Sequence, residues 1–274
     1  MKTILITWAV LLFNVSIHAD EVMIVAHRGA SKAAPENTLP AFELAWKQGA
    51  DAIEGDFHLT KDGHIVCIHD ANTRKVSGVN LVVRNVTLAE LRKLDVGARH
   101  GKAFKGTTIP TIAEVFATIP KGKKIYIEIK CGAEIIPALL QEIEKSDLKK
   151  EQIVVISFHS MVIKELKARA PRFKASWLAS LKKNKSGNMS PSLETVLNTL
   201  KHIKADGFSS SKNGVDQQVI KNVKKNGYEY HVWTVDDAKT ALRFKQWGAK
   251  SITTNVPGHI RKTLAEQKVA LDSN

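Results

Sequence analysis

Residues 53–70 read Ile-Glu-Gly-Asp-Phe-His-Leu-Thr-Lys-Asp-Gly-His-Ile-Val-Cys-Ile-His-Asp, which is the most informative segment of the chain. Asp62 and Gly63 lie between two apolar, β-branched runs, and this pattern is typical of a two-residue β-hairpin turn. Counting back from such a turn places Asp56 directly opposite His69. Opposed residues of a hairpin share a face, so this register predicts that the two side chains meet.

Glu54 belongs to the same predicted cluster, because it is two residues from Asp56 in an extended run and therefore faces the same way. Two carboxylates side by side require a compensating cation. Oxygen ligands favour a hard divalent ion such as Ca²⁺ or Mg²⁺. The alternative interpretation is a hairpin whose polar residues face water.

The first nineteen residues have the pattern of a secretory signal peptide. Lys2 provides a positive end, residues 3–17 are mostly apolar, and Ile17-His18-Ala19 is a plausible cleavage site. We therefore expect an exported protein, either periplasmic or secreted, whose residues 20–274 form a single domain. An uncleaved membrane anchor is the alternative.

The chain is strongly basic, with Lys+Arg 41 against Asp+Glu 27 and a formal net charge of +14. Such a charge attracts anionic substrates and permits peripheral contact with an anionic membrane surface. The lysines are scattered, no nucleic-acid module accompanies them, and aromatic residues make up only 6% of the chain, so we expect no nucleic-acid partner. Two cysteines, Cys67 and Cys131, are few for a disulfide scaffold, although export permits a bridge.

Strand and helix patterns alternate along the whole chain. The expected strands are Val22–Ala26, the run beginning at Ile53, Lys124–Lys130, Gln152–Ser157, Phe173–Leu178, Ala205–Ser209, Tyr228–Val235 and Ser251–Asn255. The expected helices are Leu39–Gln48, Ala133–Glu144, Met161–Arg169, Ser192–His202, Asp216–Lys225 and Asp237–Trp247. Eight such units predict a (β/α)₈ TIM barrel, with an open doubly wound sheet as the structural alternative.

A segment of about residues 71–122 interrupts this alternation after the hairpin. It contains two capping-box patterns, Thr87 with Glu90 and Thr111 with Glu114. We expect a short helical insertion that depends on the barrel for its packing.

Polar or aromatic residues stand where six of the expected strands end. They are His27-Arg28, Glu54 with Asp56, Glu128 with Lys130, Ser157 with His159, Trp233, and Thr254-Asn255. Catalytic groups of TIM barrels lie at the carboxyl ends of the strands, so the barrel prediction places these residues at one mouth.

Glu128 and Lys130 share a face of their strand and form either a structural ion pair or part of this site. If Glu128 joins the acidic pair, three carboxylates make a metal site, and Arg28 and Lys130 face the anion that the metal attracts. His27 and His69 would then exchange protons with this anion, unless they are structural residues. The histidines expected at the surface or in the hairpin are His58, His64, His100, His202 and His259.

Seven motifs together resemble the glycerophosphodiester phosphodiesterase family. They are His27-Arg28-Gly29, Pro35-Glu36-Asn37-Thr38, Glu54-x-Asp56, Leu59-Thr60-x-Asp62-Gly63, His69-Asp70, Glu128-Ile129-Lys130 and Trp233-Thr234-Val235. The resemblance is ordered and covers nearly all of residues 20–274. It implies a (β/α)₈ barrel with an insertion after the His-Asp motif.

The resemblance also implies roles for individual residues. Glu54, Asp56 and Glu128 would hold one divalent ion, Ca²⁺ or Mg²⁺. His27 and His69 would be the acid/base pair, and Arg28 and Lys130 would bind phosphate. Trp233 would form an apolar wall against the glycerol carbons, or else serve as a core aromatic residue.

Two positions depart from the pattern of the family. Many relatives have Asp near the last strand where this chain has Asn255, so a carboxylate role there is in doubt. Gly55 stands where many relatives have a β-branched residue, and this difference concerns packing.

We expect an enzyme that hydrolyses glycerophosphodiesters to glycerol 3-phosphate and an alcohol. The alternatives are a lysophospholipase D or a lyase that stops at a cyclic phosphate, and a barrel that binds phosphodiesters without catalysis.

Overall fold

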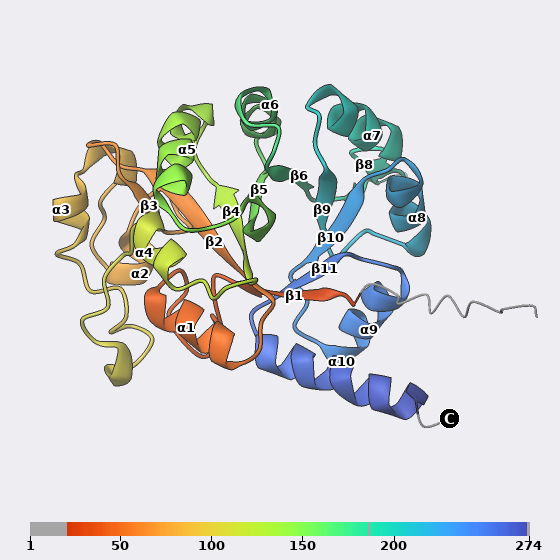
Figure 1. Cartoon of the computed structure of the whole chain (residues 1–274), viewed down its shortest axis with the longest axis horizontal. Helices are drawn as coiled ribbons and strands as arrows, with labels where there is room; N and C mark the ends of the chain where they lie inside the picture. The colour runs from red at the N-terminus through yellow and green to blue at the C-terminus, as the bar shows by residue number, and fades with distance from the viewer. Residues whose placement is uncertain (1–20, 186, 273–274) are drawn as a thin grey trace, which may run out of the picture.

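The computed structural model describes residues 21–185 and 187–272 and contains a closed barrel of parallel strands (Figure 1). The strands follow the order β1-β11-β10-β9-β6-β5-β4-β2, and pairing of β1 with β2 closes the ring. They are β1 (Met23–His27), β2 (Ala52–Leu59), β4 (Lys124–Ile129), β5 (Ile153–Ser157), β6 (Lys174–Ala179), β9 (Gly207–Ser211), β10 (Glu229–Trp233) and β11 (Ser251–Thr254). The predicted (β/α)₈ barrel is confirmed, and the open sheet is wrong.

Helices surround the barrel. They are α1 (Leu39–Lys47), α5 (Ile136–Lys145), α6 (Ser160–Arg169), α7 (Leu193–His202), α8 (Gln217–Lys225), α9 (Ala238–Gln246) and α10 (Pro257–Asp272). Side chains of Ser192, Asp216 and Asp237 cap α7, α8 and α9 by accepting a hydrogen bond from a backbone N–H in the first turn. Each of the six expected helices is present, whereas α10 is an additional helix that the sequence interpretation did not include.

Side-chain alternation divides the apolar residues of the strands into two layers. One set packs between the strands and the helices and includes Ile53, Ile127 and Phe208. The other set fills the inside of the barrel and includes Val25 and Tyr126. Residues that share the inward parity and lie near the carboxyl end of a strand therefore face the mouth.

The hairpin has a different register from the one expected. β3 (Ile65–Cys67) pairs with the last three residues of β2, with Phe57 opposite Cys67 and Leu59 opposite Ile65. The turn is a three-residue loop with Gly63 at φ +82°. The expected pairing of Asp56 with His69 is therefore wrong by one residue.

Thr60 explains the longer loop. Its backbone N donates to the His64 carbonyl (2.9 Å), and its hydroxyl accepts from the His64 N–H (2.9 Å). Gly63 takes the left-handed position of a three-residue hairpin loop, which differs from the two-residue turn that Asp-Gly most often forms.

Residues 71–122 form short helices beside β2 and β3, at the edge of the barrel (Figure 1). They are α2 (Arg74–Ser77), η1 (Val83–Asn85), α3 (Leu88–Leu91), η2 (Lys102–Phe104) and α4 (Ile112–Ala117). Both expected capping boxes form, at Thr87 and Thr111. Val83, Leu91 and Ile109 pack onto Val66 and Ile68, so the insertion has a small apolar cluster of its own against the hairpin.

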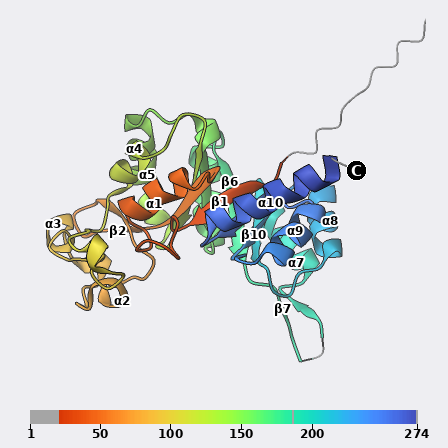
Figure 2. The same ribbon diagram turned by 90° about the horizontal axis from the view of Figure 1, so that it is seen from below.

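Between β6 and α7 the chain forms a second hairpin, β7 (Lys182–Lys183) with β8 (Met189–Ser190). It projects from the body of the molecule near α7 (Figure 2). The remaining short helices are η3 (Ala133–Ile135) and η4 (Lys150–Gln152). The predicted signal peptide, residues 1–19, lies outside the described residues; among the described ones no helix is long and apolar enough to cross a membrane.

Candidate active site

Three carboxylates meet at the carboxyl end of the barrel. Glu54 and Asp56 extend from β2, and Glu128 extends from the neighbouring strand β4, where it pairs in register with Asp56. Their exposed fractions are only 2%, 0% and 8%. One oxygen of each lies within 4.8 Å of the others, so the cluster can hold a metal ion.

Two basic residues contact these carboxylates directly. The Arg28 Nε lies 3.0 Å from Asp56 Oδ2, and Lys130 Nζ lies 2.7 Å from Glu128 Oε1 and 3.5 Å from Asp56 Oδ1. The Arg28 backbone N–H also donates to Glu54 Oε2 (2.9 Å). Arg28 has φ +56°, a conformation that is uncommon outside glycine. In this conformation its backbone N–H points at the carboxylate of Glu54.

Asn37 also orients Asp56, a role that the sequence interpretation missed. Its Nδ2 donates to Asp56 Oδ2 (2.8 Å), and its Oδ1 accepts from the Asp56 backbone N–H (3.1 Å). The same oxygen accepts from the Cys67 thiol (3.2 Å), and Cys67 and Cys131 are both free thiols. The sequence did contain a signal for Asn37, the motif Pro35-Glu36-Asn37-Thr38. Asn37 has a left-handed φ of +59°, which Asn tolerates better than most residues.

The carboxylates respond differently to burial. Burial, together with the neighbouring Asp56, raises the pKa of Glu128 to about 7 and the pKa of Glu54 well above its usual range. Burial also opposes ionisation of Asp56, but Arg28 and Lys130 hold the pKa of Asp56 below its ordinary value. The two cations therefore do not neutralise the cluster completely.

Two buried oxygens in this cluster, Glu54 Oε1 and Asp56 Oδ1, make no hydrogen bond among the described residues, although Lys130 Nζ forms an ion pair with Asp56 Oδ1 at 3.5 Å. Buried carboxylate oxygens normally have a partner. Three anionic oxygen donors in close proximity are the ligands that Ca²⁺ and Mg²⁺ prefer. The residues present therefore fit one hard divalent cation.

His27 has its orientation fixed by a chain of hydrogen bonds from the far side of the ring. Asp236 Oδ2 can only accept, so the group of Asn255 that lies 2.6 Å from it is the Nδ2 donor. Asn255 Oδ1 then faces His27 Nδ1 at 2.7 Å, which makes Nδ1 the protonated nitrogen of neutral His27. Burial, together with Arg28, lowers the pKa of His27.

A carboxylate lies near the last strand, and it comes from Asp236, between β10 and α9. Asn255 connects this carboxylate to His27. The Asp236 side chain also accepts from the Asn255 backbone N–H (2.8 Å) and the Thr254 hydroxyl (2.9 Å). Sequence reasoning missed Asp236, because it follows its strand by three residues.

His69 has a charged partner instead. Its Nδ1 lies 2.6 Å from Asp70 Oδ1, and its side chain is partly exposed. His69 reaches the site although the expected register is wrong. The Ile68 N–H is bound to the Asp56 carbonyl (2.9 Å), and the chain leaves the ladder after this bond.

A cavity of about 170 Å³ opens between these groups and an apolar wall. His27, His69, Arg28, Glu54, Glu128 and Lys130 line one side, and Phe158, Ile156, Leu178 and Trp233 line the other. The rings of Trp233 and Phe158 meet edge to face, with centroids 5.5 Å apart. Asp56 does not line the cavity but contacts Arg28 and Lys130, which do. The structure therefore brings together all eight residues that the sequence singled out.

Ser157 and His159 do not join this cavity, contrary to their expected place at the mouth. The Ser157 hydroxyl donates to the Ile129 carbonyl (2.8 Å), and His159 is exposed. Phe158, between them, has the parity that faces the cavity. The sequence could have indicated this, because Phe158 lies two residues beyond the inward-facing Ile156 of β5.

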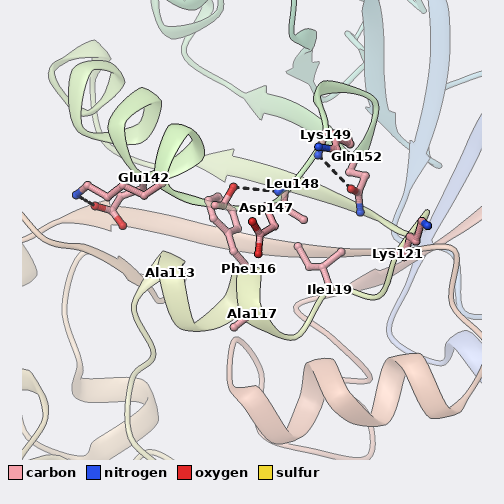
Figure 3. Close-up of a pocket in the computed structure, with 12 residues that line it drawn as sticks. Ala113, Phe116, Ala117, Ile119, Lys121, Glu142, Asp147, Leu148, Lys149 and Gln152 are labelled. Carbon is pink, nitrogen blue, oxygen red and sulfur yellow. Dashed lines mark hydrogen bonds and ion pairs between the residues drawn. The ribbon is translucent and has the colours of Figure 1, made fainter.

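A larger hollow of about 650 Å³ lies between α4 and α5, near the amino ends of β4 and β5 (Figure 3). Phe116, Ile119 and Leu148 line it, with Glu142 and Asp147 at its rim. Glu142 is paired with Lys145 (2.7 Å). The buried carboxylates and the two histidines of the mouth are absent from its lining, so the smaller cavity is the candidate active site.

A parallel barrel with acidic, basic and imidazole groups at its carboxyl mouth defines an enzyme of the TIM-barrel class. The comparisons with known proteins then identify which enzymes it resembles. The glycerophosphoryl diester phosphodiesterase family matches residues 27–259. The chain belongs to this family and is a phosphodiesterase, which removes the alternative of a barrel without catalysis.

Several relatives are similar over nearly the whole chain. A glycerophosphodiester phosphodiesterase from Caldanaerobacter subterraneus is 33% identical over 86% of this chain and 95% of its own length. The solved structure of an Oleispira antarctica phosphodiesterase in complex with the product sn-glycerol-3-phosphate is 26% identical, with a TM-score of 0.79 over 89% of this chain and 97% of that one. A rat lysophospholipase D is 36% identical over 48% of this chain and 43% of its own length.

Proposed function

We propose that the enzyme hydrolyses glycerophosphodiesters to glycerol 3-phosphate and an alcohol. The observation that carries this proposal is the cavity itself, in which an acidic cluster, two basic side chains and the histidines His27 and His69 face an apolar wall. The product bound to the Oleispira antarctica relative supports a glycerol phosphate ligand.

One divalent ion, Ca²⁺ or Mg²⁺, belongs to this proposal. Glu54, Asp56 and Glu128 would hold it. Three carboxylates and the cations Arg28 and Lys130 leave one formal negative charge, so a divalent ion changes the sign of the site and a phosphodiester anion then balances it. When bound, the ion would polarise the diester and offset the charge that grows on its oxygens.

Arg28 and Lys130 contact the carboxylates and also line the cavity in which the substrate would bind. Arg offers forked N–H donors to phosphate oxygens, and Lys offers a point charge. Trp233 and Phe158 present apolar rings to the cavity, where the carbons of glycerol would lie. The Trp233 indole Nε1 is buried without a hydrogen-bond partner among the described residues, which leaves a donor for substrate.

The different partners of the two histidines support different roles in this proposal. In neutral His27 the Nε2 lone pair is free, because Nδ1 donates to Asn255, and this nitrogen is a base. His69 is the acid, because the Asp70 carboxylate balances the positive charge of its protonated ring.

In the first step, His27 Nε2 takes the proton of a glycerol hydroxyl as its oxygen bonds to phosphorus. The bond from phosphorus to the alcohol breaks, and His69 gives that oxygen a proton. In the second step water attacks the cyclic phosphate, His69 takes the proton of water, and His27 protonates the glycerol oxygen that leaves.

A product assay tests this proposal. Glycerophosphocholine, glycerophosphoethanolamine and glycerophosphoglycerol are each incubated with the enzyme, first with EDTA and then with added Ca²⁺ or Mg²⁺. Phosphorus NMR should show glycerol 3-phosphate only after metal is added. Accumulation of a cyclic phosphate as the final product contradicts the hydrolytic step, and full activity in EDTA contradicts the metal.

A lysophospholipase D activity is the second candidate. It is favoured by the partial match to the rat enzyme and by two exposed apolar side chains that follow β5, Phe158 (43% exposed), which lines the cavity, and Met161 (60% exposed). An acyl chain would contact these residues. Release of choline from lysophosphatidylcholine at a rate comparable to that from glycerophosphocholine would support this candidate, and no release would reject it.

We further propose that the protein is exported, with residues 1–19 as the signal peptide, and that its basic surface allows peripheral contact with anionic membranes. Mass spectrometry of the mature protein should find an amino terminus at residue 20. Binding to vesicles containing anionic lipid should weaken as salt is raised.

A further inference from the structure

His58 is a buried histidine to which the proposed reaction gives no role. It was expected at the surface or in the hairpin, but its exposed fraction is 7%. His58 lies on β2, two residues beyond Asp56, so both side chains belong to the inward face of the strand. A buried histidine in the hairpin part of β2, where it pairs with Val66, requires an explanation.

The contact of His58 is with the backbone of a catalytic residue. His58 Nε2 lies 3.1 Å from the carbonyl oxygen of His69. A carbonyl can only accept, so Nε2 carries the hydrogen and donates. This bond links the end of β2 to the position where the chain has just left the hairpin ladder.

The hydrogen bond from His58 lies just beyond the point where the β2–β3 ladder ends. Ordinary strand pairing ends with Phe57 opposite Cys67, and the Ile68 N–H makes the last backbone bond to β2. His69 is the next residue, so a side chain supplies the hydrogen bond that a strand neighbour supplies elsewhere. Asp70 holds the ring of His69 and His58 holds its backbone.

We propose that His58 is a positioning residue that holds His69 at the distance from which it protonates the leaving alcohol. This proposal rests on the proposed function, in which His69 is the general acid. Loss of the donor leaves the His69 carbonyl unpaired and allows the ring to move. A displacement of about 1 Å can reduce a rate by about 10²-fold.

The test compares His58→Leu, which removes the donor, with His58→Gln, whose side-chain amide can donate from a similar position. His64→Leu is the matched control, because His64 is exposed on the same hairpin. Metal affinity, thermal midpoint, kcat and KM are measured for each variant with two substrates. One is glycerophosphocholine, and the other is the glycerophosphodiester of p-nitrophenol.

The two substrates separate positioning from a general structural role. Alcohol release in a single turnover is followed, because it reports the first step alone and the second step is common to both substrates. Choline needs a proton as it leaves, whereas p-nitrophenolate is stable without one, so a misplaced acid strongly slows the first step of only the first substrate. For His58→Leu we expect the rate of choline release to fall about 10- to 100-fold, and the rate of nitrophenolate release to fall by less than about 3-fold. His58→Gln should recover most of the loss.

Two results would overturn the proposal. Equal losses with both substrates would mean that His58 supports the cavity as a whole, and no loss with either would mean that it only fills space. His69→Ala distinguishes failure of the proposed function, because it should show the same preference for the nitrophenyl ester. If His69→Ala lacks this preference, the acid assignment itself is wrong.

Discussion

At the scale of single residues, the two histidines of the mouth differ in what holds their rings. Both rings are partly buried, but His27 donates to a neutral amide, whereas His69 lies against a carboxylate. Groups whose surroundings differ in this way can divide the roles of base and acid in one reaction. The difference makes the mechanism testable one residue at a time.

His69→Ala should reduce kcat by about 10²- to 10⁴-fold, because a positioned acid contributes about that much. Metal affinity and the thermal midpoint should stay near the parental values, since His69 contacts Asp70 and not the carboxylate cluster. His159→Ala is the control, because His159 follows a barrel strand but lies outside the cavity, and it should keep the parental rate. Near-parental activity of His69→Ala would contradict the acid assignment.

Glu128→Gln should weaken metal binding by about 10-fold or more, because it removes one anionic ligand of the proposed site. Excess metal should restore part of the rate, and isothermal titration with Ca²⁺ or Mg²⁺ measures the affinity. Glu134→Gln, at an exposed position soon after β4, should bind metal like the parent. Unchanged affinity of Glu128→Gln would place the ion elsewhere.

At the scale of elements, the sequence located most of the barrel because each strand and helix has its own periodicity and end signals. Ser192, Asp216 and Asp237 mark helix starts by local hydrogen bonds, so they can be identified without knowledge of the fold. α10 was missed because it follows the last expected strand and lacks a comparable side-chain cap signal. The β7–β8 hairpin was missed because its strands contain two residues each.

The hairpin register was the main error, and its cause is local. Asp62-Gly63 fits both a two-residue turn and a three-residue loop, and the hydroxyl of Thr60 favours the longer one. His69 still lines the same cavity as Glu54 and Glu128, because the chain leaves the ladder at that residue, but its side chain contacts Asp70. Contacts of Asn37, Asp236 and His58 could not be predicted, since they join segments whose relative position depends on the closed fold.

Two glycines with the same backbone conformation give a matched test of the turns. Gly63 (φ +82°) has no atom within 4 Å of the position that a Cβ would occupy, whereas a Cβ on Gly29 (φ +81°) would lie 2.5 Å from the backbone carbon of Ala41. Gly63→Ala should lower the free energy of unfolding by about 1 kcal/mol, from backbone strain alone. Gly29→Ala should lower the free energy of unfolding several times more.

Denaturant unfolding of both variants measures the difference. A similar loss in the two proteins would show that the close approach of α1 to Gly29 is relieved without cost. Gly29→Ala should also lower activity, because Gly29 directly follows Arg28, whereas Gly63→Ala should leave kcat near the parental value.

At the scale of the whole molecule, the carboxylate cluster links metal binding to global stability. Without metal, the raised pKa of Glu128, about 7 against an ordinary 4.5, means that the folded state holds a proton that the unfolded state has lost. Stability from this group is complete below pH 4.5, declines as pH rises to about 7, and then stays constant. The slope is about 1.4 kcal/mol per pH unit for one proton.

Glu128→Gln isolates this contribution, because Gln is neutral at every pH. The thermal midpoint of the metal-free variant should exceed that of the metal-free parent by an amount that grows from pH 5 to pH 7. Metal affinity of the parent should rise over the same range, since a metal ion must displace the proton. A constant difference between the two proteins would show that Glu128 ionises normally in the fold.

The ring of strands also has a consequence for biosynthesis. His27 belongs to the first strand, and the amide that orients it, Asn255, directly follows the last one. A ribosome therefore makes these partners more than two hundred residues apart, and a polypeptide that stops before β11 lacks the amide that orients His27. We expect prematurely terminated products to be inert, so that activity begins only after translation is complete.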